Sequence, residues 1–336
     1  MAKLKSPKTY LLFDSANTFF RARHVVRGDD IETKTGLALH ICFNSVKKCW
    51  ERFKADHVVF CFEGRSWRKD AYEPYKQNRK VTRDAMTPAE QEADKVFWES
   101  FDSFHSFVTD KTNATVLQHK QLEADDFIAG WIQAHPDDKH VIVSSDSDFY
   151  QLLSDNVSQY NGITDTWITI DGFIDEKGNH IIDKKTKEPK LPPDPEWLLF
   201  EKCMRGDSSD NVFSAYPKVR KNKLQEAFQD RHNQGFAWNN IMNARWIDHN
   251  GNEKIVKEEY ATNQKIIDLT KQPDDIKEIM FSIIDQHIKQ PKKVANVGIH
   301  LLKFCSKHEL VRIRDNVQFY AEPFNARISN NEAVVA

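Results

Sequence analysis

Short apolar runs alternate with longer amphipathic segments over the first 145 residues of the chain. Four runs rich in β-branched and aromatic residues predict buried strands over Tyr10–Asp14, Val58–Glu63, Ala114–Leu117 and His140–Ser144. The segments between them repeat their apolar residues on one face, which predicts helices over Gly36–Phe53, Thr87–Val108 and Ala124–Ala134. Alternating strands and helices favour an α/β fold in which helices flank a mostly parallel sheet.

The pattern changes in the second half of the chain. Residues 156–190 combine short apolar stretches with turn signals, which predicts a β-ribbon. The proline-rich stretch Leu191–Pro195 reads as a stiff connector, and helical patterns dominate from Glu196. We therefore predict an α/β domain over residues 1–195, a smaller helical domain over residues 196–329 and a disordered tail over residues 330–336.

Composition narrows the class of protein. Apolar residues make up 40% of the 336 residues, enough for a sizeable core, yet no apolar run approaches the roughly 18 residues of a membrane helix. The basic N-terminus lacks the apolar stretch of a signal peptide. We expect a soluble, intracellular protein without membrane contact. The five cysteines are scattered and form no Cys-x-x-Cys pair, so we expect buried thiols rather than zinc ligands or disulfides.

The net charge of −2 hides a strong local imbalance. Residues 65–83 hold seven basic side chains and only two acidic ones. The basic residues are Arg65, Arg68, Lys69, Lys76, Arg79, Lys80 and Arg83. Such a run is more often a solvated surface, but it can also hold a polyanion such as a nucleic acid.

Acidic residues concentrate where the predicted strands end. Asp14, Glu63, Asp146 and Asp148 follow three of the strands, and parallel sheets place their sites at that edge. A helix start adds three acids and a glycine-containing loop adds two: Glu123, Asp125, Asp126, Asp207 and Asp210. A single Asp after a strand is usually a turn residue. Nine carboxylates at one edge would repel each other unless cations bound between them, and Mg²⁺ or Mn²⁺ suits such oxygens. Two such ions can clamp a phosphoryl displacement.

Five motifs in this order carry a family resemblance. They are Leu11–Asp14, Tyr75–Arg79, Leu122–Asp126, Ser144–Phe149 and Gly206–Val212. Together they resemble the 5′ nucleases of the flap endonuclease family, with most similarity to phage 5′→3′ exonucleases of the phage ribonuclease H type. The likeness spans about residues 10–215 and continues more weakly over Tyr260–Pro291.

The resemblance implies a hydrolytic phosphodiesterase with a PIN-like catalytic domain and a helical arch over about residues 65–105. It implies metal-dependent exonuclease and 5′ flap endonuclease activity that leaves 5′-phosphates, on branched, nicked or flapped DNA and on RNA–DNA hybrids. Removal of RNA primers in phage DNA replication, in the cytoplasm of the infected bacterium, is the corresponding role. We expect a monomer, with a single-stranded-DNA-binding protein or a polymerase clamp as candidate partners.

The resemblance also assigns roles to residues. It implies two Mg²⁺ ions, with Mn²⁺ as a substitute. The first metal has as ligands Asp14, Glu63, Glu123, Asp125, Asp126 and Asp146. The second has Asp148, Asp207 and Asp210. Lys76 is the expected electrophile and Arg79 the expected phosphate clamp. Tyr72 and Tyr75 either stack on an unpaired base or pack within the arch.

Two positions depart from the family pattern. Glu63 stands where the family has Asp, so its oxygens are displaced by about one C–C bond. The family's Gly-Ile-Gly hairpin is missing after the last acids, so we expect no potassium site there. Duplex contact would then depend on four basic residues, Lys218, Arg220, Lys221 and Lys223.

Two other functions remain open. A ribonuclease of the PIN type shares the acidic edge, although the basic arch and the long C-terminal part argue against it. A non-catalytic DNA-junction binding protein with a decayed site is the second, and the complete set of acids argues against decay.

Overall fold

The central element of the protein is a seven-stranded sheet. The computed structural model describes residues 6–25 and 31–328. The strand order is β3-β2-β1-β4-β5-β6-β7, in which β1 to β5 run parallel and β6 and β7 are antiparallel. The strands are β1 (Thr9–Asp14), β2 (His57–Cys61), β3 (Thr115–Leu117), β4 (Lys139–Val143), β5 (Val157–Asn161), β6 (Thr166–Thr169) and β7 (Gly172–Ile174). The predicted α/β class and the four predicted strands are confirmed.

The predicted β-ribbon is an extension of this sheet rather than a separate unit. Val157 of β5 pairs in parallel with His140 of β4, and β6 and β7 then add antiparallel strands. Short bridges continue the pattern beyond β7, at Ile174–His180 and Ile182–Pro189. β5 joins the main sheet because its side chains Val157 and Tyr160 are buried in the cores beside it.

Alternate side chains of each central strand enter the two cores that cover the sheet. Leu11 and Phe13 of β1 pack in one core and Tyr10 and Leu12 in the other. The first core lies under α1 (Ser15–Val25), α2 (Ile31–Phe53) and α5 (Pro88–Asp110). The second lies under α6 (Ala124–Ala134) and α11 (Asp274–Lys289). The helix predicted from Gly36 begins five residues earlier, and all five cysteines are buried thiols as predicted.

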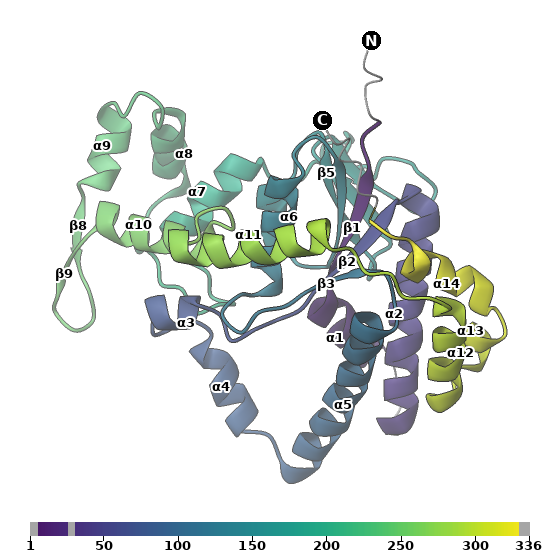
Figure 1. Ribbon diagram of the computed structural model, residues 1–336. Coiled ribbons are helices and arrows are strands. Elements are labelled where there is room, and N and C mark those ends of the chain that lie inside the picture. The colour runs from purple at the N-terminus through teal and green to yellow at the C-terminus, as the bar shows by residue number, and fades with distance from the viewer. Residues whose placement is uncertain (1–5, 26–30, 329–336) are drawn as a thin grey trace.

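A helical arch stands out from the sheet. The segment that follows β2 forms α3 (Arg68–Ala71) and α4 (Gln77–Asp84), and α5 returns the chain to the sheet. Figure 1 shows α4 and the first half of α5 as two arms that meet around residues 85–87. Thr87 caps α5 through a reciprocal pair of hydrogen bonds with Glu90, and Pro88 occupies the first helical position, as the sequence predicted.

A second lobe follows the sheet. The helix α7 (Pro195–Arg205) packs against η1 (Ser147–Leu152), and three further helices and a two-stranded hairpin follow it in the chain. They are α8 (Lys221–Gln229), α9 (Phe236–Met242), β8 (Arg245–Ile247), β9 (Glu253–Ile255) and α10 (Val256–Ile267). This lobe has its own core, around Phe200, Met204 and Leu224.

The predicted helical domain over residues 196–329 would place the rest of the chain in that lobe. The chain instead leaves the lobe after α10. Helix α11 packs on α6, and the last helices return to the first core of the sheet (Figure 1). They are α12 (Val297–Lys307), α13 (Val311–Arg314) and α14 (Val317–Asn325). Phe324 of α14 stacks on Phe60 of β2, with ring centroids 6.1 Å apart. Buried apolar residues of these helices complete the sheet core, which a boundary drawn from helical patterns alone could not anticipate. The predicted tail over residues 330–336 lies outside the described residues.

No helix in the described ranges is long and apolar enough to span a membrane.

Candidate metal and nucleic-acid site

The carboxyl ends of β1 and β4 lie side by side and carry the first predicted acids. Asp14 is buried at the end of β1, and its Oδ2 atom accepts a hydrogen bond from Ser144 Oγ at 2.9 Å. Its Oδ1 atom accepts from the backbone N–H of Asn17 at 3.2 Å, and Asn17 Oδ1 accepts from the N–H of Ser145 at 3.0 Å. These bonds hold Asp14 beside the segment that carries Asp146, which is the convergence that the strand ends predicted.

Glu63 reaches the same edge through a close backbone contact. The N–H of Gly64 donates to the carbonyl of Leu122 at 2.8 Å, just before α6 begins. A Cβ atom added at Gly64 would lie 2.1 Å from the carbonyl oxygen of His119, so a residue with a side chain cannot fit there without moving the chain. Glu63 Oε2 then accepts from the N–H of Ala124 at 3.4 Å.

We call the group formed by Asp14, Glu63, Glu123 and Asp125 the deep acidic cluster. Burial raises the pKa of Asp14 to about 6. Burial, followed by repulsion from Glu63 and Asp14, raises the pKa of Asp125 well above its ordinary value. Surrounding protein and repulsion from Glu123 also raise the pKa of Glu63, although its side chain is exposed and water weakens the effect. These carboxylates therefore disfavour one another's charge, and a cation would relieve that repulsion.

Lys76 supplies positive charge at this cluster. Its Nζ atom donates to Glu123 Oε1 and lies 3.8 Å from Asp210 Oδ2. Burial alone would lower the pKa of Lys76, but the attraction of Glu123 and Asp210 outweighs burial and raises it. The pKa of Glu123 is correspondingly lowered to about 2, because Lys76 and Arg68 outweigh the effect of burial. The backbone of Lys76 is left-handed, with φ of 56°, a conformation that is uncommon for a residue with a side chain and that concentrates at functional sites.

A second group, the outer acidic cluster, consists of Asp146, Asp148 and Asp207. Asp146 caps η1 by accepting from the N–H of Asp148 at 2.9 Å. Burial and then repulsion from Asp146 raise the pKa of Asp148 to about 6. Asp207 is buried, yet hydrogen bonds from Lys202 and Ser209 lower its pKa to about 2.

Lys202 was not predicted from the sequence. Its Nζ atom donates to Asp148 Oδ1 at 2.5 Å and to Asp207 Oδ2 at 2.7 Å, so one ammonium joins two acids of the outer cluster. Lys202 lies in the last turn of α7, immediately before the acidic loop. A lysine one turn ahead of Gly206-Asp207 is the only signal in the sequence, and by itself it indicates no more than a helix end.

Asp210 lies with the arch rather than with the outer cluster. It accepts from the hydroxyl of Tyr75 at 3.0 Å and from Arg79 Nη2 at 2.7 Å. The N–H of Lys76 donates to the Asp210 carbonyl at 2.9 Å. The loop that holds Asp210 is closed by two backbone hydrogen bonds between Asp207 and Val212. The acidic loop and the base of the arch are therefore one connected unit.

Arg68 and Asp126 do not have their predicted roles. Arg68 was expected to contact nucleic acid, but it is 1% exposed and its Nη1 and Nη2 atoms bind both carboxylate oxygens of Asp126. The Nη1 atom also donates to Glu123 Oε2 at 2.9 Å, and Nε donates to the carbonyl of Ile266 at 2.8 Å. Asp126 is fully buried and also accepts from Gln272 Nε2 at 3.2 Å. In this structure the ion pair therefore occupies the guanidinium that was expected to contact phosphate and the carboxylate that was expected to bind metal.

The remaining predicted nucleic-acid contacts divide by exposure. Tyr75 is buried, and its hydroxyl donates to Glu123 and Asp210. Of the two predicted roles, this arrangement fits packing within the arch rather than stacking on an unpaired base. Tyr72 is half-buried and accepts from the N–H of Phe213 at 3.2 Å. The other predicted residues are exposed: Arg65, Lys69, Arg79, Lys80 and Arg83 at the arch, and Lys218, Arg220, Lys221 and Lys223 before and within the first turn of α8.

The donor set fits hard divalent cations, because both clusters consist of carboxylates. As the side chains stand, no three His, Cys, Asp or Glu groups within residues 6–25 and 31–328 are placed to hold a metal ion. The ammonium groups of Lys76 and Lys202 lie among these carboxylates and offset part of their charge. A cation that bound Glu123, Asp148 or Asp207 through the oxygens that now contact these lysines would have to displace the ammonium groups.

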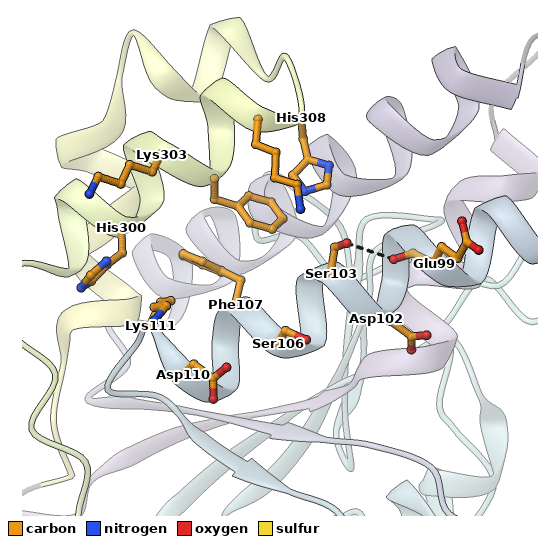
Figure 2. A pocket seen from close by; sticks show the side chains of 12 residues that line it. Glu99, Asp102, Ser103, Ser106, Phe107, Asp110, Lys111, His300, Lys303 and His308 are labelled. Carbon is orange, nitrogen blue, oxygen red and sulfur yellow. Dashed lines mark hydrogen bonds between the residues drawn. The ribbon is translucent and has the colours of Figure 1, made fainter.

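A groove elsewhere on the molecule is separate from this chemistry. Figure 2 shows it between α5 and α12. Its volume is about 510 Å³. Acidic residues of α5 such as Glu99 and Asp110 line it together with Lys303 of α12 and His308, which directly follows that helix. No residue of either acidic cluster lines the groove, so we do not assign it to catalysis.

Comparison with known proteins decides the family. The model of the 5′-3′ exonuclease, N-terminal resolvase-like domain matches residues 9–184, just over half of the chain. The chain belongs to this family. The matched range includes the deep acidic cluster, the arch, Asp146 and Asp148, and it ends before Asp207 and Asp210.

Curated relatives share only part of their length with this chain. DNA polymerase I of Rhizobium leguminosarum is 28% identical over 229 residues, which are 63% of this chain and 20% of the polymerase. Flap endonuclease Xni of Psychromonas ingrahamii is 29% identical over 170 residues, 48% of this chain and 59% of that protein. The chain thus spans about a fifth of the polymerase and about three fifths of the flap endonuclease.

Solved structures share the fold over a longer range. The zinc-bound 5′-exonuclease of phage T5 superposes with a TM-score of 0.57 at 18% identity, covering 83% of this chain and 99% of that one. A complex of the T5 D15 flap endonuclease with DNA and metal ions gives a TM-score of 0.52 at 16% identity, covering 94% and 100%. These likenesses concern the fold and extend it into the second lobe.

Proposed function

We propose that this protein is a divalent-metal-dependent 5′→3′ exonuclease and structure-specific 5′ flap endonuclease that acts on DNA and on RNA–DNA hybrids. The observation that carries the proposal is the position of the deep acidic cluster at the base of a basic arch, with Lys76 in contact with both. Membership of the 5′-3′ exonuclease family and the fold of the T5 nucleases support it.

Two Mg²⁺ ions, for which Mn²⁺ can substitute, would be held by residues of the two clusters together with Asp210. The first ion would take Asp14, Glu63, Glu123, Asp125 and Asp146. The second would take Asp148, Asp207 and Asp210. Bound there, such ions lower the pKa of an attacking water and stabilise the leaving oxygen. Asp126, which the sequence also assigned to the first ion, pairs with Arg68 through both of its oxygens in this structure and would have to release that pair to join the set.

The basic residues at the arch base would bind the phosphate that is cut. Lys76 and Arg79 now contact Glu123 and Asp210, and a phosphate oxygen would compete for the same N–H groups. Lys76 is positioned to stabilise charge that develops on the phosphate, and Arg79 to orient it. Arg79 is exposed while Lys76 is nearly buried, so Arg79 can meet the incoming strand first.

The arch would receive the single-stranded 5′ end. Its exposed cations, Lys80 and Arg83 on α4, follow Arg79 along the same arm. Phosphate contacts of this kind release counterions, so binding should weaken steeply as the salt concentration rises. The basic residues at the start of α8 would hold the duplex beyond the cut.

The proposed biological role is removal of RNA primers during phage DNA replication, in the cytoplasm of the infected bacterium. The similarity of the fold to T5 nucleases supports a phage setting. We propose that the protein acts as a monomer, with a single-stranded-DNA-binding protein or a polymerase clamp as partner.

The test is cleavage of a 5′-labelled flap substrate with and without Mg²⁺. We expect cleavage only with the metal and a product that carries a 5′-phosphate. Asp146→Asn should abolish cleavage and leave duplex binding within a few-fold, whereas Asp171→Asn, an exposed carboxylate in the β6–β7 turn, should change neither. Binding without cleavage would favour a junction-binding protein, cleavage of single-stranded RNA alone would favour a PIN-type ribonuclease, and normal cleavage by the Asp146 variant would refute the assigned site.

A further inference from the structure

A pocket in the second lobe lies apart from both acidic clusters. It is formed by α8, α9 and the segments that precede and follow them, and it has a volume of about 450 Å³. Its lining includes Tyr216, Lys223, Phe236, Asn240 and Asn243. This volume falls within the range of pockets that hold small organic ligands, about 300–1,000 Å³. None of these residues except Lys223 belongs to the site described above.

Phe236 gives the pocket an aromatic wall that is open to solvent. It is the first residue of α9 and is 86% exposed, more than any other large hydrophobic side chain in the described part of the chain. Single exposed hydrophobic residues are common and need no explanation by themselves. A phenylalanine ring that lines a pocket and has free faces, however, provides a surface on which a nucleobase can stack.

Two amide side chains line the same pocket with unused hydrogen-bonding capacity. The side chains of Asn240 and Asn243 are exposed and make no hydrogen bond within residues 6–25 and 31–328. The neighbouring Asn239 differs, because its amide donates to the carbonyls of Gln234 and Gly235. Asparagine offers both donors and an acceptor, which matches the edges of nucleobases.

Positive charge lies in the chain segment that forms one side of the pocket. Lys223 lines it, and Lys218, Arg220 and Lys221 are exposed in the same turn-to-helix segment. None of the four forms an ion pair with another described residue, in contrast to Arg79 at the arch, which pairs with Asp210. A flat stacking surface, free amides and unpaired cations together match a nucleotide, which joins a base to a phosphate.

The chain limits how far the pocket can lie from the acids. Tyr216 is six residues after Asp210, so their Cα atoms are at most about 20 Å apart. A nucleic-acid strand in a duplex advances about 3.4 Å per nucleotide, so this span corresponds to about six nucleotides. We propose that the pocket binds one unpaired nucleotide of the substrate, within about six nucleotides of the phosphate that is cut. The proposal rests on the proposed function for the identity of the polymer.

The test measures binding without cleavage. A 5′-flapped duplex fixes the register, and one unpaired nucleotide is inserted in turn at each of ten positions on either strand. Fluorescence anisotropy in EDTA gives the dissociation constants. We expect the wild-type protein to bind at least one insertion within six nucleotides of the junction about fivefold or more tightly than the fully paired flap. Phe236→Ala should remove this preference and leave affinity for the paired flap within twofold.

Matched variants separate the pocket from general DNA binding. Phe319→Ala removes another exposed phenylalanine, on α14, and should keep the preference. Asn240→Ala combined with Asn243→Ala should reduce it, while Lys221→Ala should weaken both substrates equally. Equal wild-type affinity for all insertions, or a preference that survives in the Phe236 variant, would refute nucleotide binding by the pocket. Neither result would refute the proposed nuclease function. Failure to bind any flap would overturn both proposals.

Discussion

Arg68 and Asp126 are joined by a two-point ion pair that is shut off from solvent. The Nη2–Oδ1 and Nη1–Oδ2 distances are 2.9 and 3.0 Å, and the two side chains are 1% and 0% exposed. Because Arg68 begins α3 and Asp126 lies in the first turn of α6, the pair fixes the base of the arch to α6, which starts directly after Glu123 and carries Asp125. The arch and the deep acidic cluster therefore share one buried anchor.

Arg68→Met should destabilise the protein strongly. The change leaves Asp126 and Glu123 without their buried cation, and breaking a buried pair from one side costs about 3–5 kcal/mol. Urea unfolding monitored by circular dichroism measures the loss. The matched control is Arg65→Met, because Arg65 forms an exposed pair with Asp70 and should lose no more than about 1 kcal/mol. Equal stability of the two variants would show that the anchor is not needed.

Lys76→Ala should reduce the rate of cleavage under single-turnover conditions. If its ammonium stabilises charge on the phosphate, the loss should be about 10²–10³-fold, the usual effect of removing one such donor. Lys80→Ala is the control, since Lys80 is exposed on α4 and outside the cluster. That variant should bind flap DNA less tightly and show a smaller salt dependence, with its rate at saturation unchanged. An unaffected rate in Lys76→Ala would remove this residue from the mechanism.

Acid should destabilise the fold through two buried histidines. Burial lowers the pKa of His57 to about 3 and that of His140 to about 4, whereas an unfolded histidine titrates near 6.5. Between these values the unfolded chain binds protons that the folded chain does not, so stability falls as the pH drops below about 6.5. At pH 5 each residue costs up to roughly 2 kcal/mol.

A single substitution isolates this effect from that of Asp14, whose pKa shift has the opposite consequence. Burial raises the pKa of Asp14, so the folded state gains a proton and stability as the pH falls through about 6. Urea unfolding at pH 7.5 and 5.0 should show a smaller loss for His57→Gln than for the wild type. His180→Gln, at an exposed histidine, should match the wild type. An unchanged loss in the His57 variant would refute the assignment.

Divalent ions should stabilise the folded protein in the absence of DNA. Ions that bind only the folded state add about 2.7 kcal/mol at one hundred times their dissociation constant. We expect Mg²⁺ or Mn²⁺ to raise the melting temperature, and EDTA to reverse the rise. Asp148→Asn should reduce the shift and Asp171→Asn should not. A melting temperature that does not change with millimolar Mg²⁺ or Mn²⁺ would count against metal binding at the two clusters.

The sequence predicts those parts of the site that depend on local order. Asp14 and Asp146 follow short apolar runs, and the rule for parallel sheets is enough to bring their chain segments together. The start of α5 was also predictable, because Thr87, Pro88 and Glu90 are adjacent in sequence. In each case the residues that determine the structure lie within a few positions of one another.

The parts that were missed depend on contacts between distant segments. Arg68 lies in a basic run that resembles a solvated surface, but its partner Asp126 is 58 residues away. Lys202 resembles an ordinary residue of a helix end until the fold places Asp148 beside it, 54 residues away in sequence. Tertiary structure brings each of these cations to its acidic partner, and hydrophobic periodicity along the sequence cannot reveal such long-range pairs.

The return of the last helices to the sheet has a consequence for how this chain must be made. Phe324 fills a place beside Phe60 and Phe43, more than 260 residues away in sequence. During synthesis, the core beside the sheet that carries the acids lacks the packing of Phe324 until α14 has left the ribosome. We therefore expect the nascent chain to gain its activity only after α14 has emerged, and a fragment that ends at residue 195 to aggregate rather than to fold.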